Sequence, residues 1–374
     1  MRKFAALATA LSLAPSASAL AEENSGAPEI EASIEAESHS HTASRPGAKP
    51  AEHKPAPAIR LPGFAAVLAN DAPIEDDSGW HITPEADAWQ AIARSTTDTR
   101  QKARWSYARS LIGKGRAAEA YGVLVAMTQD DPDLSLVPAH SLARGAALVA
   151  LNRHQEALDA LSTEQLAENA EACAWRLRAL AALELNAEAV KEWTCARPAI
   201  FSRVAGSRTP FLLAAAQAAL QQEKPGSAIQ ILKPVSDIDA AANLIRGRAF
   251  FQLGSEQEGR LRLGRAAENG APEQRLDARV SLLEELVTHG HAKPREVAFE
   301  LDRICYSWRG GPLERRVLKL RFSLAKKARD DRAMLATGAA LLRYHPMSGD
   351  SGMLLSLLQD KLAAILSPGS KIPL

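Results

Sequence analysis

The sequence has few aromatic residues, only three cysteines and almost no net charge. Aromatic side chains make up 5% of the 374 residues, and the formal net charge is +1. A charge this small supplies no global field for nucleic acid or an anionic membrane, so we expect no nucleic-acid partner. No segment reaches the roughly 20 apolar residues of a membrane-spanning helix, so we expect no transmembrane segment in the mature chain.

The sequence also lacks the motifs of several common enzyme classes. The patterns H-E-x-x-H, G-x-S-x-G and G-x-x-x-x-G-K-[ST] do not occur. His289 and His291 flank a glycine in a predicted turn, with no nearby Cys or Asp to complete a metal site. The sequence therefore predicts a protein that is not an enzyme and has no catalytic residue, metal or cofactor.

The first 60 residues have the composition of targeting and linker segments. A basic start, an apolar run over residues 4–13 and the small residues Ala17 and Ala19 are typical of a secretory signal peptide. We expect cleavage after Ala19, so that residues 1–19 are removed and the mature protein is exported, to the periplasm in a Gram-negative source. An uncleaved N-terminal anchor is the alternative. Residues 20–60 are rich in Ala, Glu, Ser and Pro, which predicts a disordered linker.

What the chain has in abundance is Ala and Leu, which are strong helix formers. The stretch 138–161 reads as a helix of small residues, a turn at residues 151–154 and a second helix. Two helices of about ten residues cannot bury their apolar faces alone, so this unit needs copies of itself on both sides. Strand-like alternation of β-branched residues is hard to find, so we predict an all-α fold.

The same unit recurs over residues 103–350 in about seven copies, which predicts an α-solenoid of stacked helical hairpins. The second helices are expected to start at intervals of 31 to 39 residues, near Ala120, Ala157, Ala189, Ala228, Gly259, Val297 and Met334. Residues 61–102 are expected to cap the first repeat. Residues 351–374 are expected to form a C-terminal capping helix and tail, with a helix offered to a partner as the alternative.

Two of the turns carry a family pattern. Residues 115–120 and 152–157 resemble the turn and second-helix start of tetratricopeptide repeats, and Pro132 resembles the proline that closes such a unit. The resemblance covers residues 103–346 and is clearest in the first two copies. It implies a right-handed superhelix whose concave groove is lined by the first helices.

Basic residues recur near the middle of the first helices, with aromatic residues close by. If these helices line a groove, the side chains form a basic, partly aromatic wall suited to binding carboxylates. The alternative is that the arginines pair with acids on adjacent repeats or face solvent. The candidate partner-binding residues are Arg104, Trp105, Tyr107, Arg109, Arg144, Trp175, Arg178, Arg248, Arg279 and Arg321.

The cysteines offer one disulfide. Cys173 and Cys195 lie on the two helices of the third hairpin, at similar distances from its turn, and an exported protein can form a bond between them. Cys305 then has no partner. Buried free thiols are the alternative for all three.

Together these features predict a non-enzymatic scaffold or adaptor of the cell envelope that binds another protein or a peptide segment in a basic concave groove. One alternative is a structural accessory subunit of an envelope machine, such as a secretion apparatus or a flagellar motor. Another is a cell-wall enzyme with a helical superstructure.

Overall fold

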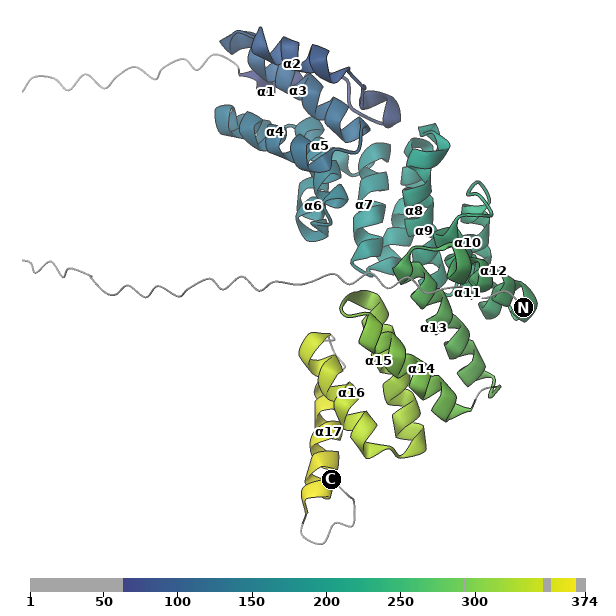
Figure 1. The fold of residues 1–374 in the computed structure, drawn as a ribbon. Coiled ribbons are helices and arrows are strands. Elements are labelled where there is room, and N and C mark those ends of the chain that lie inside the picture. Colours follow the sequence, from purple (N-terminus) through teal and green to yellow (C-terminus); the bar gives the residue numbers. More distant parts are fainter. Residues whose placement is uncertain (1–62, 292, 346–350, 368–374) are drawn as a thin grey trace, which may run out of the picture. The chain divides into compact units, whose positions relative to one another are not determined.

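A computed structural model describes residues 63–291, 293–345 and 351–367. The expected signal peptide and linker lie outside these residues. The described residues form helices, turns and loops without any strand, and successive helices pack on one another along the chain (Figure 1). The predicted all-α solenoid of helical hairpins is therefore confirmed.

Seven antiparallel hairpins make up the array in the described part of the chain. Their helices are α3 (Thr97–Gly113) with α4 (Ala117–Asp130), α5 (Pro138–Ala150) with α6 (His154–Leu161), α7 (Ala170–Ala182) with α8 (Asn186–Ser202), α9 (Ala205–Gln221) with α10 (Pro225–Leu232), α11 (Ala240–Gln252) with α12 (Glu256–Asn269), α13 (Pro272–Thr288) with α14 (Pro294–Ser307), and α15 (Gly311–Ala328) with α16 (Asp331–Tyr344).

Shorter and flanking elements complete the fold. Before the hairpins come α1 (Phe64–Leu68), the 3-10 turn η1 (Asp77–Gly79) and α2 (Glu85–Ala93), and after them comes α17 (Ser351–Leu366). Two more 3-10 turns, η2 (Pro132–Leu136) and η3 (Glu164–Leu166), connect hairpins. The repeats thus begin at Thr97, six residues before the position that we expected.

Every hairpin turn in the described chain contains one residue in the left-handed region. Its φ lies between 55° and 75°, and it ends the first helix in the αL conformation that commonly stops helices. Four of the seven are not glycine, although this conformation costs an ordinary residue roughly 1–2 kcal/mol. The residues are Gly115, Asn152, Glu184, Glu223, Gly254, Gly290 and Arg329.

The predicted starts of the second helices are confirmed to within one turn. Each of the seven residues that the sequence analysis gave as a start is the fourth residue of its second helix. All seven are buried, five of them with the small side chain of Ala or Gly. A Cβ on Gly259 would lie 2.8 Å from the ring of Phe251, which explains why Gly replaces the usual Ala there. A small residue at this position lets the two helices approach closely.

The buried core is continuous on the N-terminal side and separate on the C-terminal side. One cluster of buried apolar residues extends from Ala65 in α1 to Ala249 in α11. A second, smaller cluster extends from Val280 in α13 to Leu324 in α15.

Residues 63–84, which we call the N-terminal strap, reach well beyond the first hairpin. The amide of Ala65 donates to Oδ2 of Asp131 at the end of α4, at 2.9 Å. Further along, the carbonyl of Ile74 accepts from Asn169 before α7, at 2.9 Å, and the amide of Asp77 donates to Ser202 at the end of α8, at 3.2 Å. The strap therefore spans three hairpins, whereas the sequence predicted that residues 61–102 cap the first repeat.

A buried carboxylate fixes the end of the strap. Glu171 is fully buried and accepts from the indole nitrogens of Trp80 and Trp175, each at 2.7 Å, and from the guanidinium of Arg203. A buried carboxylate needs charge pairing and hydrogen bonds, and all three donors supply them at Oε1, whereas the buried Oε2 has no hydrogen-bond partner in the described chain. After the strap, α2 packs on α3, where the rings of Trp89 and Tyr107 lie 5.4 Å apart.

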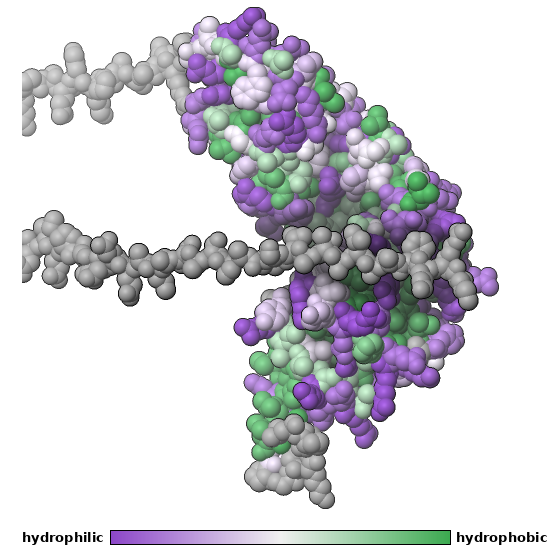
Figure 2. All heavy atoms as spheres, in the orientation of Figure 1, coloured by the Kyte–Doolittle hydropathy of each residue, from purple (hydrophilic) through white to green (hydrophobic). Residues whose placement is uncertain are grey.

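The last helix covers one side of α16 and leaves its own outer face apolar. Leu358 is buried against Gly338, whereas Met353, Leu355, Leu362 and Leu366 are exposed. Figure 2 shows this apolar patch over α17. No helix among the described residues is both long and apolar enough to cross a membrane.

Candidate functional site

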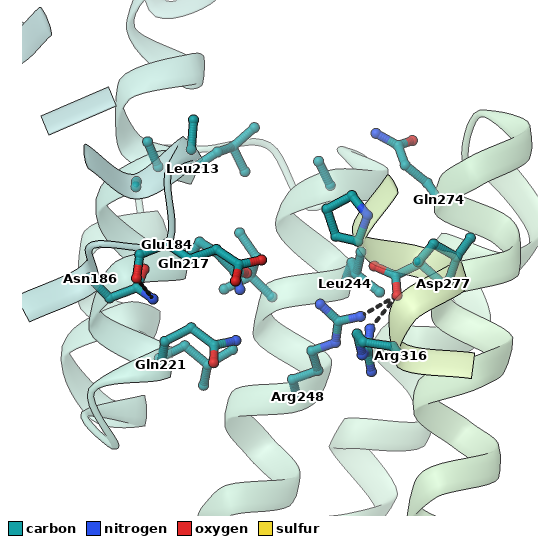
Figure 3. Close-up of a pocket in the computed structure, with 18 of the residues that line it drawn as sticks. Glu184, Asn186, Leu213, Gln217, Gln221, Leu244, Arg248, Gln274, Asp277 and Arg316 are labelled. Carbon is teal, nitrogen blue, oxygen red and sulfur yellow. Dashed lines mark hydrogen bonds and ion pairs between the residues drawn. The ribbon is translucent and has the colours of Figure 1, made fainter. Parts of the chain in front are cut away.

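A hollow of about 1120 Å³ is lined mainly by the first helices of the third to seventh hairpins. Its lining includes residues of α7, α9, α11, α13 and α15 (Figure 3). Apolar side chains such as Leu213, Leu244 and Phe251 alternate with the amides of Asn186, Gln217 and Gln221. The first helices therefore line a cavity, as expected of a groove, along this part of the array.

The charges that line the hollow are balanced. Five are basic and five are acidic, so the structure corrects the expectation of a basic wall. The sequence pattern marked the arginines but not the carboxylates that oppose them. The charged lining residues are Arg178, Arg248, Arg315, Arg316 and Lys319, with Glu184, Glu273, Asp277, Glu284 and Glu285.

Two of the four arginines that line the hollow pair with acids of a neighbouring hairpin. Arg248 on α11 forms an ion pair with Asp277 on α13 at 2.6 Å and donates to Ser281 at 2.9 Å. Arg316 on α15 pairs with Asp277 on α13 (Figure 3). It also pairs with Glu284, which lies on α13 as well. Burial lowers the pKa of Arg248, and the nearby charge of Arg316 adds to this effect. These arginines join hairpins, which is the alternative left open by the sequence.

One ion pair connects hairpins that are distant in the chain. Glu184 in the turn of the third hairpin pairs with Arg315 on α15 in the seventh, and both residues line the hollow. The two residues are 131 positions apart in the sequence, and three complete hairpins lie between them. The hollow is therefore bounded by contacts between its first and last hairpins as well as between neighbours.

Arg178 differs from the other arginines of the hollow. Its guanidinium lies over the rings of Trp175 and Phe211, 5.2 and 4.9 Å from their centres. It forms no ion pair with any residue that the structure describes, and burial, followed by the charge of Arg203, lowers its pKa to about 10. A cation held by ring faces while facing a cavity can accept a carboxylate from another molecule.

The strap and α2 pack on aromatic residues that the sequence assigned to the groove: Trp80 shares Glu171 with Trp175, and Trp89 packs on Tyr107. Trp105, Tyr107 and Trp175 are all buried. Arg109 lies over Trp105, 5.6 Å from its ring centre, and the strap residue Asp71 favours its charged form, although burial lowers its pKa overall. The first-helix face of hairpins one to three is therefore occupied by the chain's own residues.

The remaining candidate arginines lie outside the hollow. Arg144 is exposed at a smaller pocket between α4 and α5, and Arg321 pairs with Asp302 at 2.9 Å. Arg104 and Arg279 pair with Asp130 and Glu300 in their own hairpins. Of the ten candidates, only Arg178 and Arg248 line the hollow. Gln217, which takes the place of the recurring arginine in the fourth copy, lines it too.

Two of the three cysteines form a disulfide, and the third is free. Cys173 and Cys195 are joined in a disulfide across α7 and α8, with their Cα atoms 5.9 Å apart. Cys305 is a free thiol whose pKa is raised to about 11 by burial. In the part of the chain that the structure describes, no three His, Cys, Asp or Glu residues are grouped to hold a metal ion.

Comparisons with known proteins add one solved structure. No protein-family model matches the sequence, and no curated protein matches it. The chain is similar to a tetratricopeptide repeat protein from Parabacteroides merdae ATCC 43184, with 13% sequence identity and a TM-score of 0.49. The match covers 70% of this chain and 98% of that one.

Proposed function

We propose that this protein is a non-enzymatic scaffold of the cell envelope that holds a segment of a partner protein in the hollow. The observation that carries the proposal is a cavity of about 1120 Å³ bordered by five successive first helices, with apolar side chains between amides. Apolar side chains together with polar groups that converge on one cavity are typical of a binding site, and this hollow also carries ten charged side chains. The envelope location rests on the signal-peptide features of the sequence.

The N-terminal strap supplies a precedent for such an occupant. It runs along hairpins one to three, buries Trp80 and uses side-chain hydrogen bonds to fix its backbone at Ile74 and Asp77. A partner segment in the hollow would continue this mode of binding along hairpins three to seven. Because Arg178 is the arginine there without a carboxylate, we expect the segment to carry a carboxylate that reaches it.

Site-specific crosslinking in cells tests the proposal. A photoreactive residue at Gln217 in the hollow is expected to capture a partner protein, whereas the same residue at the exposed Arg260 on α12 is not. Arg178→Gln is expected to reduce the yield at Gln217 by about tenfold, because it removes the unpaired cation. The matched control is Arg144→Gln, which changes an exposed arginine of another first helix.

Equal crosslinking yields with and without Arg178 would contradict the proposed role of this residue. Crosslinks confined to α17 would instead favour the accessory-subunit alternative, because the exposed Met353, Leu355, Leu362 and Leu366 lie there. The charge reversal Arg248→Glu is a poor test, because the new glutamate would face Asp277 and disturb the contact between α11 and α13.

A further inference from the structure

A second groove lies away from the hollow, between the second helices α8 and α10. It has a volume of about 670 Å³, and the side chains of α9 form its floor. We propose that this groove docks an amphipathic helix of a partner protein, with an apolar stripe facing the groove and carboxylates along its flanks. The proposal does not depend on the hollow, which lies along the first helices.

The first wall of the groove is an apolar stripe on α8. Val190, Trp193 and Phe201 recur at helical spacing on this helix and line the groove together with Arg197. Phe201 is 41% exposed, although it is among the larger apolar side chains of the protein. An aromatic residue at the edge of an apolar groove is typical of the anchors that dominate binding energy at interfaces.

The floor of the groove is made of small residues, and the opposite wall includes two of them. Gly226 and Ser227 of α10 lie in this wall beside Gln230 and Ile231, and a Cβ on Gly226 would meet no atom within 4 Å. Ala215 and Ala219 of α9, one turn apart, form the floor. Alanine at the contact lets a packed helix approach to the short end of the usual 8–10 Å interaxial distance. A helix therefore fits the groove better than a bulky extended chain.

The helix α10 is short, which keeps the groove open. It has eight residues, whereas its neighbour α8 has 17, so α10 covers only part of the length that α8 presents. The second helices α4, α12, α14 and α16 have 14 residues each, and α6 alone is as short as α10 among the second helices of the described chain. An added helix in the groove would restore the apolar contacts that a longer α10 would make.

The charges of the groove specify the flanks of its occupant. Arg197 and Lys224 are the charged residues that line it, with no carboxylate among the lining residues, whereas the hollow has equal numbers of both signs. Both side chains are exposed and form no ion pair within the described chain. Charges at the rim of an interface select a partner of opposite sign, so we infer an acidic flank on the helix.

Fluorescence anisotropy with a synthetic helix tests this inference on the full-length mature protein. The probe is a labelled peptide of about 15 residues, long enough to be partly helical, with leucines spaced three and four apart and glutamates beside them. We expect it to bind at least about tenfold more tightly than the same peptide with lysines for the glutamates. Absence of binding, or equal binding of both peptides, would overturn the proposal.

Variants locate the binding to the groove. Arg197→Glu combined with Lys224→Glu is expected to weaken binding of the acidic peptide at least about tenfold, and Ser227→Trp to abolish it by filling the groove. The matched control is Lys191→Glu with Lys233→Glu, which changes exposed lysines on or next to the same helices that do not line the groove. An equal loss in the control would show unspecific attraction and overturn the proposal.

Two further measurements separate this groove from the hollow and from a lipid site. Arg178→Gln is expected to leave peptide binding unchanged, so failure of the proposed function and failure of this site are distinguishable. Vesicles of phosphatidylglycerol test whether the groove takes an anionic lipid instead. Vesicle binding that is lost in the Ser227→Trp variant, without peptide binding, would assign a lipid to the groove and overturn the helical partner.

Discussion

The hairpins before and after α11 bury their first-helix faces in different ways. In the first three hairpins the strap and α2 pack on the first helices, and Trp80 and Trp175 meet at Glu171. The core cluster that begins at Ala65 continues from these hairpins to Ala249 in the fifth. In the last three, the first helices keep an open side, and arginine–carboxylate pairs join one hairpin to the next. The same repeat thus supports a closed region and an open one.

This difference shows how an array of similar repeats can leave part of its first-helix face uncovered by the rest of the chain. Apolar and aromatic side chains on α3 and α7 lose water when the strap covers them, and this stabilises the N-terminal region. Paired charges on α11, α13 and α15 tolerate water, so the same face can remain uncovered there at little cost. The open region is therefore accessible without displacement of any part of the described chain.

The largest effect is expected when the strap loses its anchor. Trp80→Ala should lower the free energy of unfolding by about 3–5 kcal/mol, because a buried Trp is lost and Glu171 loses a hydrogen-bond donor. Urea denaturation gives the magnitude, and hydrogen exchange should show α3 to α7 opening before α13 to α16. Trp308→Ala in the C-terminal region is the comparison, with a smaller loss because Trp308 is only partly buried. Equal losses would remove the distinction between the two regions.

A smaller effect is expected from acid, and it should act on the N-terminal region. His140 on α5 is buried, and burial lowers its pKa from 6.5 to about 4. As the pH falls through this window the unfolded chain gains a proton that the folded chain resists, so the free energy of unfolding decreases by about 3 kcal/mol.

The control for the acid effect is His140→Gln, which cannot take up that proton. Denaturation curves of both proteins between pH 7 and pH 4 should diverge, with the wild type losing more stability than the variant. Curves that stay parallel would show that His140 does not cause the acid sensitivity.

The smallest effect is expected at the turns, where the two regions are alike. Glu223→Gly in the fourth hairpin and Arg329→Gly in the seventh should each raise the free energy of unfolding by about 0.5–1 kcal/mol, because both residues have positive φ. Gly115→Ala and Gly254→Ala should lower it by about as much. Thermal unfolding measures all four, and a gain in one region without a gain in the other would show that the turns are not equivalent.

Local sequence signals located most of the fold. The small residues Ala120, Ala157 and Ala189 marked the second helices correctly because tight packing inside a hairpin allows little else at that position. The turn signals were less sharp, since Glu184 and Glu223 adopt the left-handed conformation without being typical of it. The family resemblance implied a groove lined by the first helices, but the basic charge predicted for it was wrong, because five carboxylates line the hollow beside its five basic residues.

What the sequence determined by itself was the repeat, because its spacing and its small residues act within a hairpin of about 36 residues. Only the tertiary structure decided which faces stay open. The contacts of Trp80 with Glu171 and of Glu184 with Arg315 join residues 91 and 131 positions apart. No local pattern specifies such a contact, since it depends on how each hairpin stacks on the next, and those small rotations accumulate along the chain.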